Sequence, residues 1–146
     1  MTALPIVTGA DTPVLRTKTQ RVPQVTKDTL KLIKDMKETV KKAEGLGLAA
    51  PQIGQSLRVC LAHINGKMTP LINPDIVWRS TETIVMEEGC LSLPGQDVAV
   101  ARAVEITIVY TDEKGQQQER RLHDLDARVV QHEVDHLEGV LIVDYR

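Results

Sequence analysis

Two histidines near the end of the chain are spaced so that they could hold one metal ion. Residues 132–136 read HEVDH, which is an HExxH motif. In a helix, His132 and His136 lie one turn apart on the same face, so both imidazoles can reach a single ion. Glu133 follows the first histidine and can accept a proton from a water molecule there. The motif alone predicts a metallohydrolase, and the plain alternative is a surface helix that contains two histidines by chance.

A catalytic metal site of this kind needs a third protein ligand. Downstream of His136 the only acidic residues are Glu138 and Asp144. Glu138 projects from another part of the helix, and no pattern recommends Asp144. Cys90 is the better candidate, because it lies in an irregular stretch between Gly89 and a Pro-Gly pair, where the backbone can approach a ligand. Two imidazoles and one thiolate would leave a fourth position open for water.

A first helix must lie upstream of these residues. Its apolar positions recur at helical spacing up to Ala43, and Thr26 or Asp28 can cap its start. Gly45 and Gly47 are expected to stop it. Everything before this helix is punctuated by threonine and proline and is expected to be irregular.

A second helix over residues 125–138 must carry the HExxH motif. We expect Asp124 to be its N-cap and Gly139 to follow its end. Alternating or continuous apolar runs predict strands, and Asn65-Gly66 predicts a tight hairpin turn. These strands are expected at 57–63, 68–72, 75–78, 83–86, 98–101, 104–111, 117–122 and 140–144. Residues 1–146 therefore predict one α+β domain, with mostly antiparallel strands around a central HExxH helix and an N-terminal helix.

Composition and charge exclude several classes of function. The net charge is −2 and there are only three aromatic residues, one Trp and two Tyr, which argues against DNA and single-strand nucleic-acid binding. The lysines of residues 27–42 alternate with acids and fit a solvated helix face better than a nucleic-acid patch. There is no signal-peptide pattern and no apolar run of about 20 residues, so no membrane contact is expected.

The two cysteines do not form the framework of a secreted scaffold. Cys60 lies between Val59 and Leu61 and is expected to be a buried apolar side chain, whereas Cys90 has the surroundings of a ligand. Two cysteines allow at most one bridge, which favours a reducing compartment. We therefore expect the protein in the cytoplasm.

Three separated segments resemble the signature motifs of the peptide deformylase family. They are residues 45–52 (GLGLAAPQ), 88–92 (EGCLS) and 131–137 (QHEVDHL), in the family's order. Weaker similarity extends over the chain, at residues 13–16 (PVLR), 72–74 (INP) and Arg102. The resemblance implies a metal-dependent amidohydrolase that removes formyl groups from the N-terminal formylmethionine of new proteins and releases formate.

The resemblance also implies a role for each motif residue. Cys90, His132 and His136 would hold one divalent metal ion, Fe(II) first, with Zn, Ni or Co as alternatives that the same ligands accept. Glu133 would act as general base and then as general acid. The side chain of Gln52 and the backbone N–H of Leu91 would stabilise the oxyanion.

Substrate contacts follow from the same resemblance. The backbone of Gly47 would bind the substrate as an added strand. A slot for the methionine side chain would be lined by residues that suit a core equally well: Leu46, Met86, Leu125 and Val129. We place Arg128 at the mouth of this pocket and expect Glu88 and Arg102 to form a charge pair that steadies the Cys90 loop.

The expected partners are formyl-Met N-termini and, transiently, the ribosome, with the protein itself a monomer. The sequence ends at Arg146, where many bacterial members continue into a C-terminal helix, so a minimal form is implied. The protein could contact the ribosome through the helix of residues 27–42 instead.

Two alternatives to this function stay open: another HExxH metallohydrolase, such as a peptidase, and a catalytically idle relative that serves as a metal-binding or interaction module. The cysteine motif disfavours the first, and the complete set of catalytic residue types disfavours the second.

Overall fold

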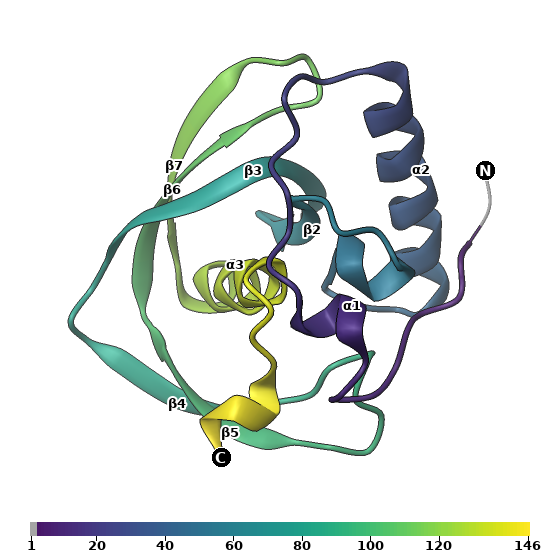
Figure 1. The fold of residues 1–146 in the computed structure, drawn as a ribbon. Helices are drawn as coiled ribbons and strands as arrows, with labels where there is room; N and C mark the ends of the chain where they lie inside the picture. The colour runs from purple at the N-terminus through teal and green to yellow at the C-terminus, as the bar shows by residue number, and fades with distance from the viewer. Residues whose placement is uncertain (1–2) are drawn as a thin grey trace.

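Helix α3 (Asp124–Leu137) carries the HExxH motif and lies at the centre of the fold, surrounded by the strands and by helix α2 (Lys27–Lys42), as Figure 1 shows. The computed structural model describes residues 3–146. The other elements are α1 (Pro13–Arg16), β1 (Gly47–Ala49), the 3-10 helix η1 (Ala50–Ile53), β2 (Val59–Ile64), β3 (Lys67–Arg79), β4 (Thr83–Glu88), β5 (Val98–Ala103), β6 (Glu105–Thr111), β7 (Gln117–His123) and the 3-10 helix η2 (Ile142–Tyr145). The predicted α+β class is confirmed.

The strands form two antiparallel sheets. One has five strands in the order β1-β2-β3-β6-β7, and the other pairs β4 with β5. The predicted tight turn joins β2 to β3, with both Asn65 and Gly66 at positive φ. Strand β1 was not predicted, because three residues beside two glycines give no periodic signal.

Two strands expected at 68–72 and 75–78 are one long strand, β3, so that expectation was wrong. The register shifts between Ile72 and Asp75, and Asn73 takes a φ of +51°. This irregularity absorbs Pro74, which has no N–H for the ladder. A bulge therefore takes the place of the break expected between the two strands.

The interior lies on both faces of strand β2. Cys60, Ala62 and Ile64 pack toward α3, while Val59 and Leu61 pack toward α2. Burial on both faces explains why this strand is a continuous apolar run rather than an alternating one. Cys60 is fully buried, as expected, and burial raises the pKa of its thiol well above the usual value.

The ends of helix α2 are close to the expected places. Thr26 caps the start: its hydroxyl accepts from the N–H of Thr29, and the hydroxyl of Thr29 accepts from the N–H of Thr26. The helix stops at Lys42, and Glu44 takes the left-handed conformation at φ +56°. Gly47, expected to help stop the helix, lies in β1 instead.

Helix α3 begins without the predicted cap. The N-cap is His123, and no side chain caps the helix there. The N–H of Asp124 is bonded to the carbonyl of Val104 at 2.8 Å, which carries the chain straight from β7 into the helix and leaves the Asp124 side chain exposed. Gly139 follows the helix in the left-handed conformation, at φ +76°, as predicted.

Both terminal segments differ from expectation. Residues 13–16, expected to be irregular, form one turn of helix with Pro13 at its start, where the fixed φ of proline suits a helix. The strand expected at 140–144 is wrong: residues 142–145 form a 3-10 helix. The carboxylate of Asp144 accepts from the N–H of Leu141 at 2.9 Å and from Arg16 at 2.6 Å, and these bonds stabilise the turn. Across the described part of the chain, no helix is long and apolar enough to cross a membrane.

Gly139 and Gly66 offer a matched test of how the end of α3 is fixed. A Cβ on Gly139 would lie 2.6 Å from the carbonyl oxygen of Arg16, whereas a Cβ on Gly66, at nearly the same φ of +77°, would meet open space. We expect Gly66→Ala to lower the free energy of unfolding by about 1–2 kcal/mol through backbone strain alone. Gly139→Ala should lower it by more, because the backbone of Arg16 must also move. Urea denaturation compares the two, and equal losses would contradict the packing argument.

Candidate active site

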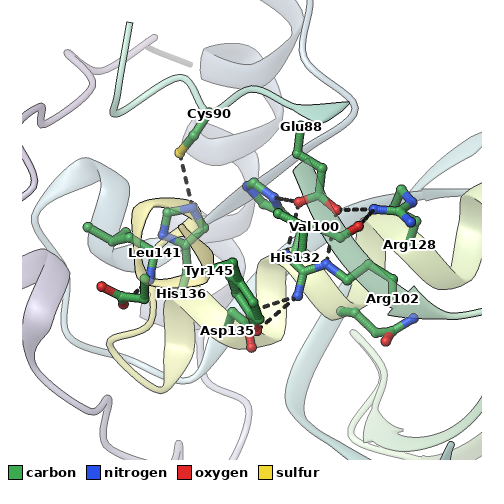
Figure 2. Close-up of polar contacts among 12 residues, drawn as sticks. Glu88, Cys90, Val100, Arg102, Arg128, His132, Asp135, His136, Leu141 and Tyr145 are labelled. Atoms are coloured by element: carbon green, nitrogen blue, oxygen red, sulfur yellow. Dashed lines mark hydrogen bonds and ion pairs between the residues drawn. The ribbon is translucent and has the colours of Figure 1, made fainter. Parts of the chain in front are cut away.

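Three side chains from two parts of the chain converge on one point. Cys90 lies in the loop after β4, and His132 and His136 lie on α3. Their ligand atoms all lie within 4.8 Å of one another, and the Cys90 sulfur is 3.3 Å from Nε2 of His136 (Figure 2). Within residues 3–146 no other group of three His, Cys, Asp or Glu side chains is gathered in this way.

The chemistry of these donors fits a divalent metal ion. Nδ1 of His132 meets a carboxylate oxygen of Glu88 at 2.8 Å, which leaves Nε2 for the ion. Burial lowers the pKa of His136 to about 3, so its imidazole is neutral, as a ligand must be. Burial also acts against a proton on His132, but hydrogen bonds to Cys90 and Glu88 outweigh it and raise the pKa to about 10. A metal ion bound at Nε2 would take the place of that proton.

Glu133 is buried beside the metal ligands. Burial raises the pKa of its carboxyl to about 7, and one carboxylate oxygen, Oε1, has no hydrogen-bond partner. The other oxygen approaches the backbone of Gly47 so closely that a Cβ there would lie 2.6 Å from it. The same Cβ would lie 2.8 Å from the carbonyl oxygen of Leu61 in β2, so both the carboxylate and the neighbouring strand require glycine at position 47.

Gln52, in η1, lies next to Cys90. Its Oε1 accepts from the N–H of Ala49 at 2.9 Å, and its Nε2 donates to the hydroxyl of Ser92 at 3.1 Å. Nε2 is 3.9 Å from the Cys90 sulfur. An amide donor is thus held next to Cys90.

A cavity of about 500 Å³ opens onto this group of residues. Each residue predicted to contact substrate or oxyanion lines it: Leu46, Gly47, Gln52, Met86, Leu91, Leu125 and Val129. Leu46, Met86 and Leu125 are each about half exposed, so for these three the lining interpretation is favoured over the core interpretation. Val129 is buried, so it belongs to the core and also lines the cavity.

Comparison with known proteins identifies the family. The family model for polypeptide deformylase matches residues 3–146. The chain belongs to the peptide deformylase family. The peptide deformylase of Pseudothermotoga lettingae is 48% identical over 132 residues, which cover 90% of this chain and 77% of the relative. That of Rickettsia akari is 42% identical over 155 residues, covering 99% and 88%.

Solved structures of deformylases have the same fold. The peptide deformylase of Thermotoga maritima superposes with a TM-score of 0.94 at 40% identity, covering 99% of this chain and 97% of that one. The enzyme of Ehrlichia chaffeensis, solved in complex with actinonin, gives a TM-score of 0.96 at 35% identity, covering 100% and 90%. The resemblance of the three motifs to this family is confirmed.

In this deformylase-family chain, the buried carboxylate of Glu88 supports the site. It accepts two hydrogen bonds from Arg102, at 2.9 Å each, so the expected pair is present (Figure 2). Burial alone would raise the pKa of Glu88, but the bonds to His132 and Arg102 hold it well below its usual range. The carboxylate is therefore ionised and keeps His132 in one orientation.

We expected Arg128 at the mouth of the pocket, but its side chain is buried instead. It borders the cavity, but its guanidinium is buried and contacts Glu88, and it donates to the carbonyls of Val100 at 3.1 Å and Ile84 at 2.6 Å. A buried guanidinium must be paired with a carboxylate or hydrogen-bonded to carbonyl oxygens. The carboxylate that pairs with Arg128 is that of Glu88, which lies 40 residues away in the sequence. No local pattern shows that proximity.

Sequence reasoning missed the other half of this network. Arg102 also donates to Asp135 at 2.6 Å, and Tyr145 donates to the same carboxylate at 2.6 Å. The position of Asp135 between the two histidines was the available signal. The acids that were set aside as ligands pair elsewhere, Glu138 with Arg58 at 3.0 Å and Asp144 with Arg16 at 2.6 Å.

Arg102 tests whether this network supports metal binding. Arg102→Ala leaves the carboxylates of Glu88 and Asp135 without their shared partner, so His132 loses its fixed orientation. We expect metal affinity to fall by about 10- to 100-fold, measured by competition with a chelator. Arg121→Ala is the control, because Arg121 is an exposed arginine paired with Glu105. Full metal occupancy and full activity in Arg102→Ala would overturn the idea.

Proposed function

We propose that this member of the peptide deformylase family removes the formyl group from N-terminal formylmethionine through the residues that line the cavity. The supporting observation is that a Cys–His–His cluster, a buried carboxylate and an amide donor meet at one cavity. Together these residues come from all three sequence motifs. A peptidase of the HExxH type has no use for the Gln52 and Cys90 pair, and an idle relative would not need the whole set.

Cys90, His132 and His136 would hold the metal ion, and the amide of Gln52 lies beside them. A bound divalent ion acts as a Lewis acid and lowers the pKa of a water molecule at its open position. We propose Fe(II) as the ion in the cell; one thiolate and two imidazoles also suit Zn, Ni or Co.

Glu133 is the proton carrier in this proposal. In its ionised form the carboxylate takes a proton from the attacking water, and it then gives the proton to the leaving amine. A carboxyl with a pKa near the working pH can do both. Burial supplies that pKa, and the unpartnered Oε1 gives the proton an acceptor that no other residue occupies.

The oxyanion that forms on the formyl group needs donors that are already in place. We assign Nε2 of Gln52 and the backbone N–H of Leu91 to this task. Gln52 cannot rotate freely, because both ends of its amide are bonded, at Ala49 and at Ser92. Leu91 directly follows the ligand Cys90 and lines the same cavity.

The cavity suits the methionine side chain and the start of a peptide. Its apolar wall is formed by Leu46, Met86, Leu125 and Val129. Strand β1 is at the edge of the five-stranded sheet, so the backbone of Gly47 can pair with a substrate added as a further strand. Formyl-Met N-termini of nascent chains are the substrates we infer.

The setting in the cell follows from this substrate. We propose a cytoplasmic monomer of one domain that meets the ribosome transiently and binds neither DNA nor membranes. The exposed lysines of α2 provide a positive face for such a contact: Lys27, Lys31, Lys34, Lys41 and Lys42. Both cysteines are free thiols, which agrees with a reducing compartment.

Formate release from a formyl-Met peptide tests the proposal. Anaerobically prepared, metal-loaded protein should release formate, and Glu133→Gln should lose at least about 10²-fold in rate while it keeps the metal. The rate should rise with pH as Glu133 ionises, because the base is the carboxylate. Its pKa is about 7 in the metal-free protein, and a cation beside it will lower that value.

Two results would count against the proposal in different ways. No formate from the metal-loaded protein would support the idle alternative. Full activity in Glu133→Gln would leave the reaction standing and remove Glu133 from it. Cleavage of internal peptide bonds in place of formate release would favour the peptidase.

A further inference from the structure

Gln52 is fixed by groups outside the metal site. Gln52 is 2% exposed and Ser92 is fully buried. The N–H of Ala49 can only donate, so the atom it meets must be Oε1, and Nε2 must face Ser92 and Cys90. One of the two Nε2 protons is directed to the Ser92 hydroxyl at 3.1 Å, and the other is on the side of the Cys90 sulfur, which is 3.9 Å from Nε2. Ala49 therefore decides which end of the amide faces the cavity, and Ser92 holds the Nε2 end in place.

The N-terminal segment forms hydrogen bonds with the backbone of both Gln52 and Ser92. The N–H of Val7 donates to the carbonyl of Gln52 at 2.7 Å, and the N–H of Gly9 donates to the carbonyl of Ser92 at 3.0 Å. The N–H groups of Val7 and Gly9 thus reach η1 and the Cys90 loop, at residues that lie 40 apart in the sequence. Gly9 has a φ of +108°, and a Cβ there would lie 2.8 Å from the Thr12 hydroxyl, so glycine is needed for this path.

The loop that carries Cys90 needs such support. Residues 89–97 belong to no helix or strand. Leu93, in this loop, is buried in a cluster with Leu15 and Val100, and Val7 and Ala10 from the N-terminal segment pack against the same cluster. The N-terminal segment therefore holds this loop by apolar contact as well as by hydrogen bonds.

We propose that Ser92 and the backbone of residues 7–9 form a brace that positions the Gln52 amide beside Cys90. Ser92 is then a positioning residue for the deformylation reaction: it touches no substrate and acts through Gln52. This inference rests on the proposed role of Gln52 as oxyanion donor. It predicts that the brace matters for turnover far more than for substrate binding.

A double-mutant cycle separates this role from a general structural one. Ser92→Ala should lower kcat by about tenfold with little change in KM, and Gln52→Ala by about 10²–10³-fold. The double variant should match Gln52→Ala alone, because Ser92 has nothing left to position. Ser80→Ala is the control: its hydroxyl is hydrogen-bonded to the backbone of Glu82 and Glu105, and Ser80 does not line the cavity. Thermal unfolding of each variant shows that the fold is retained.

The outcomes distinguish the brace from the proposed function. Additive losses in the double variant, or an unchanged kcat in Ser92→Ala, would overturn the brace while Gln52 keeps its role. An unchanged kcat in Gln52→Ala would overturn both. If Ser92→Ala does not fold, Val7→Pro and Val7→Ala replace it: both lose the valine side chain, and only Val7→Pro loses the N–H that binds Gln52. A lower kcat in Val7→Pro than in Val7→Ala supports the brace, and equal values overturn it.

Discussion

A single buried carboxylate, that of Glu88, constrains the arrangement of the site. A charge removed from water must be paired and hydrogen-bonded. Glu88 stands at the end of β4, and its partners are Arg102 on β5 and Arg128 and His132 on α3. The small sheet and the central helix are therefore joined through one side chain. The same side chain sets which nitrogen of His132 is free for a metal ion.

The position of Cys90 follows from this constraint. Cys90 comes two residues after Glu88, so the attachment of β4 to α3 brings the start of the Cys90 loop close to the histidines. Helix α3 is itself held at its far end, where Arg58 pairs with Glu138 at 3.0 Å and the N–H and hydroxyl of Thr19 both bond to the carbonyl of Leu137. A ligand set assembled from a rigid helix and a short loop needs both attachments, because small displacements of a catalytic group are costly.

Much of the fold and of the candidate site could be predicted from the sequence. The features that could not be predicted share a physical cause. The HExxH helix, helix α2 and the turn at Asn65-Gly66 depend on neighbours within a few residues, so periodicity and capping signals suffice. The motifs also indicated Cys90 and Gln52. Other features depend on partners far along the chain. They are the contacts of the Arg128 side chain, the bulge at Asn73 and the 3-10 helix at residues 142–145. No local pattern reports such partners, as the Arg16–Asp144 contact across 128 residues shows.

The central claim is that Cys90, His132 and His136 bind one metal ion together. Anaerobic titration of the metal-free protein with Co(II), followed by optical absorption, tests it most directly, because a thiolate ligand adds a charge-transfer band that imidazole and carboxylate ligands lack. We predict one equivalent of Co(II) per chain with that band, and loss of the band in Cys90→Ala. Saturation without a thiolate band, or an unchanged band in Cys90→Ala, would contradict the account.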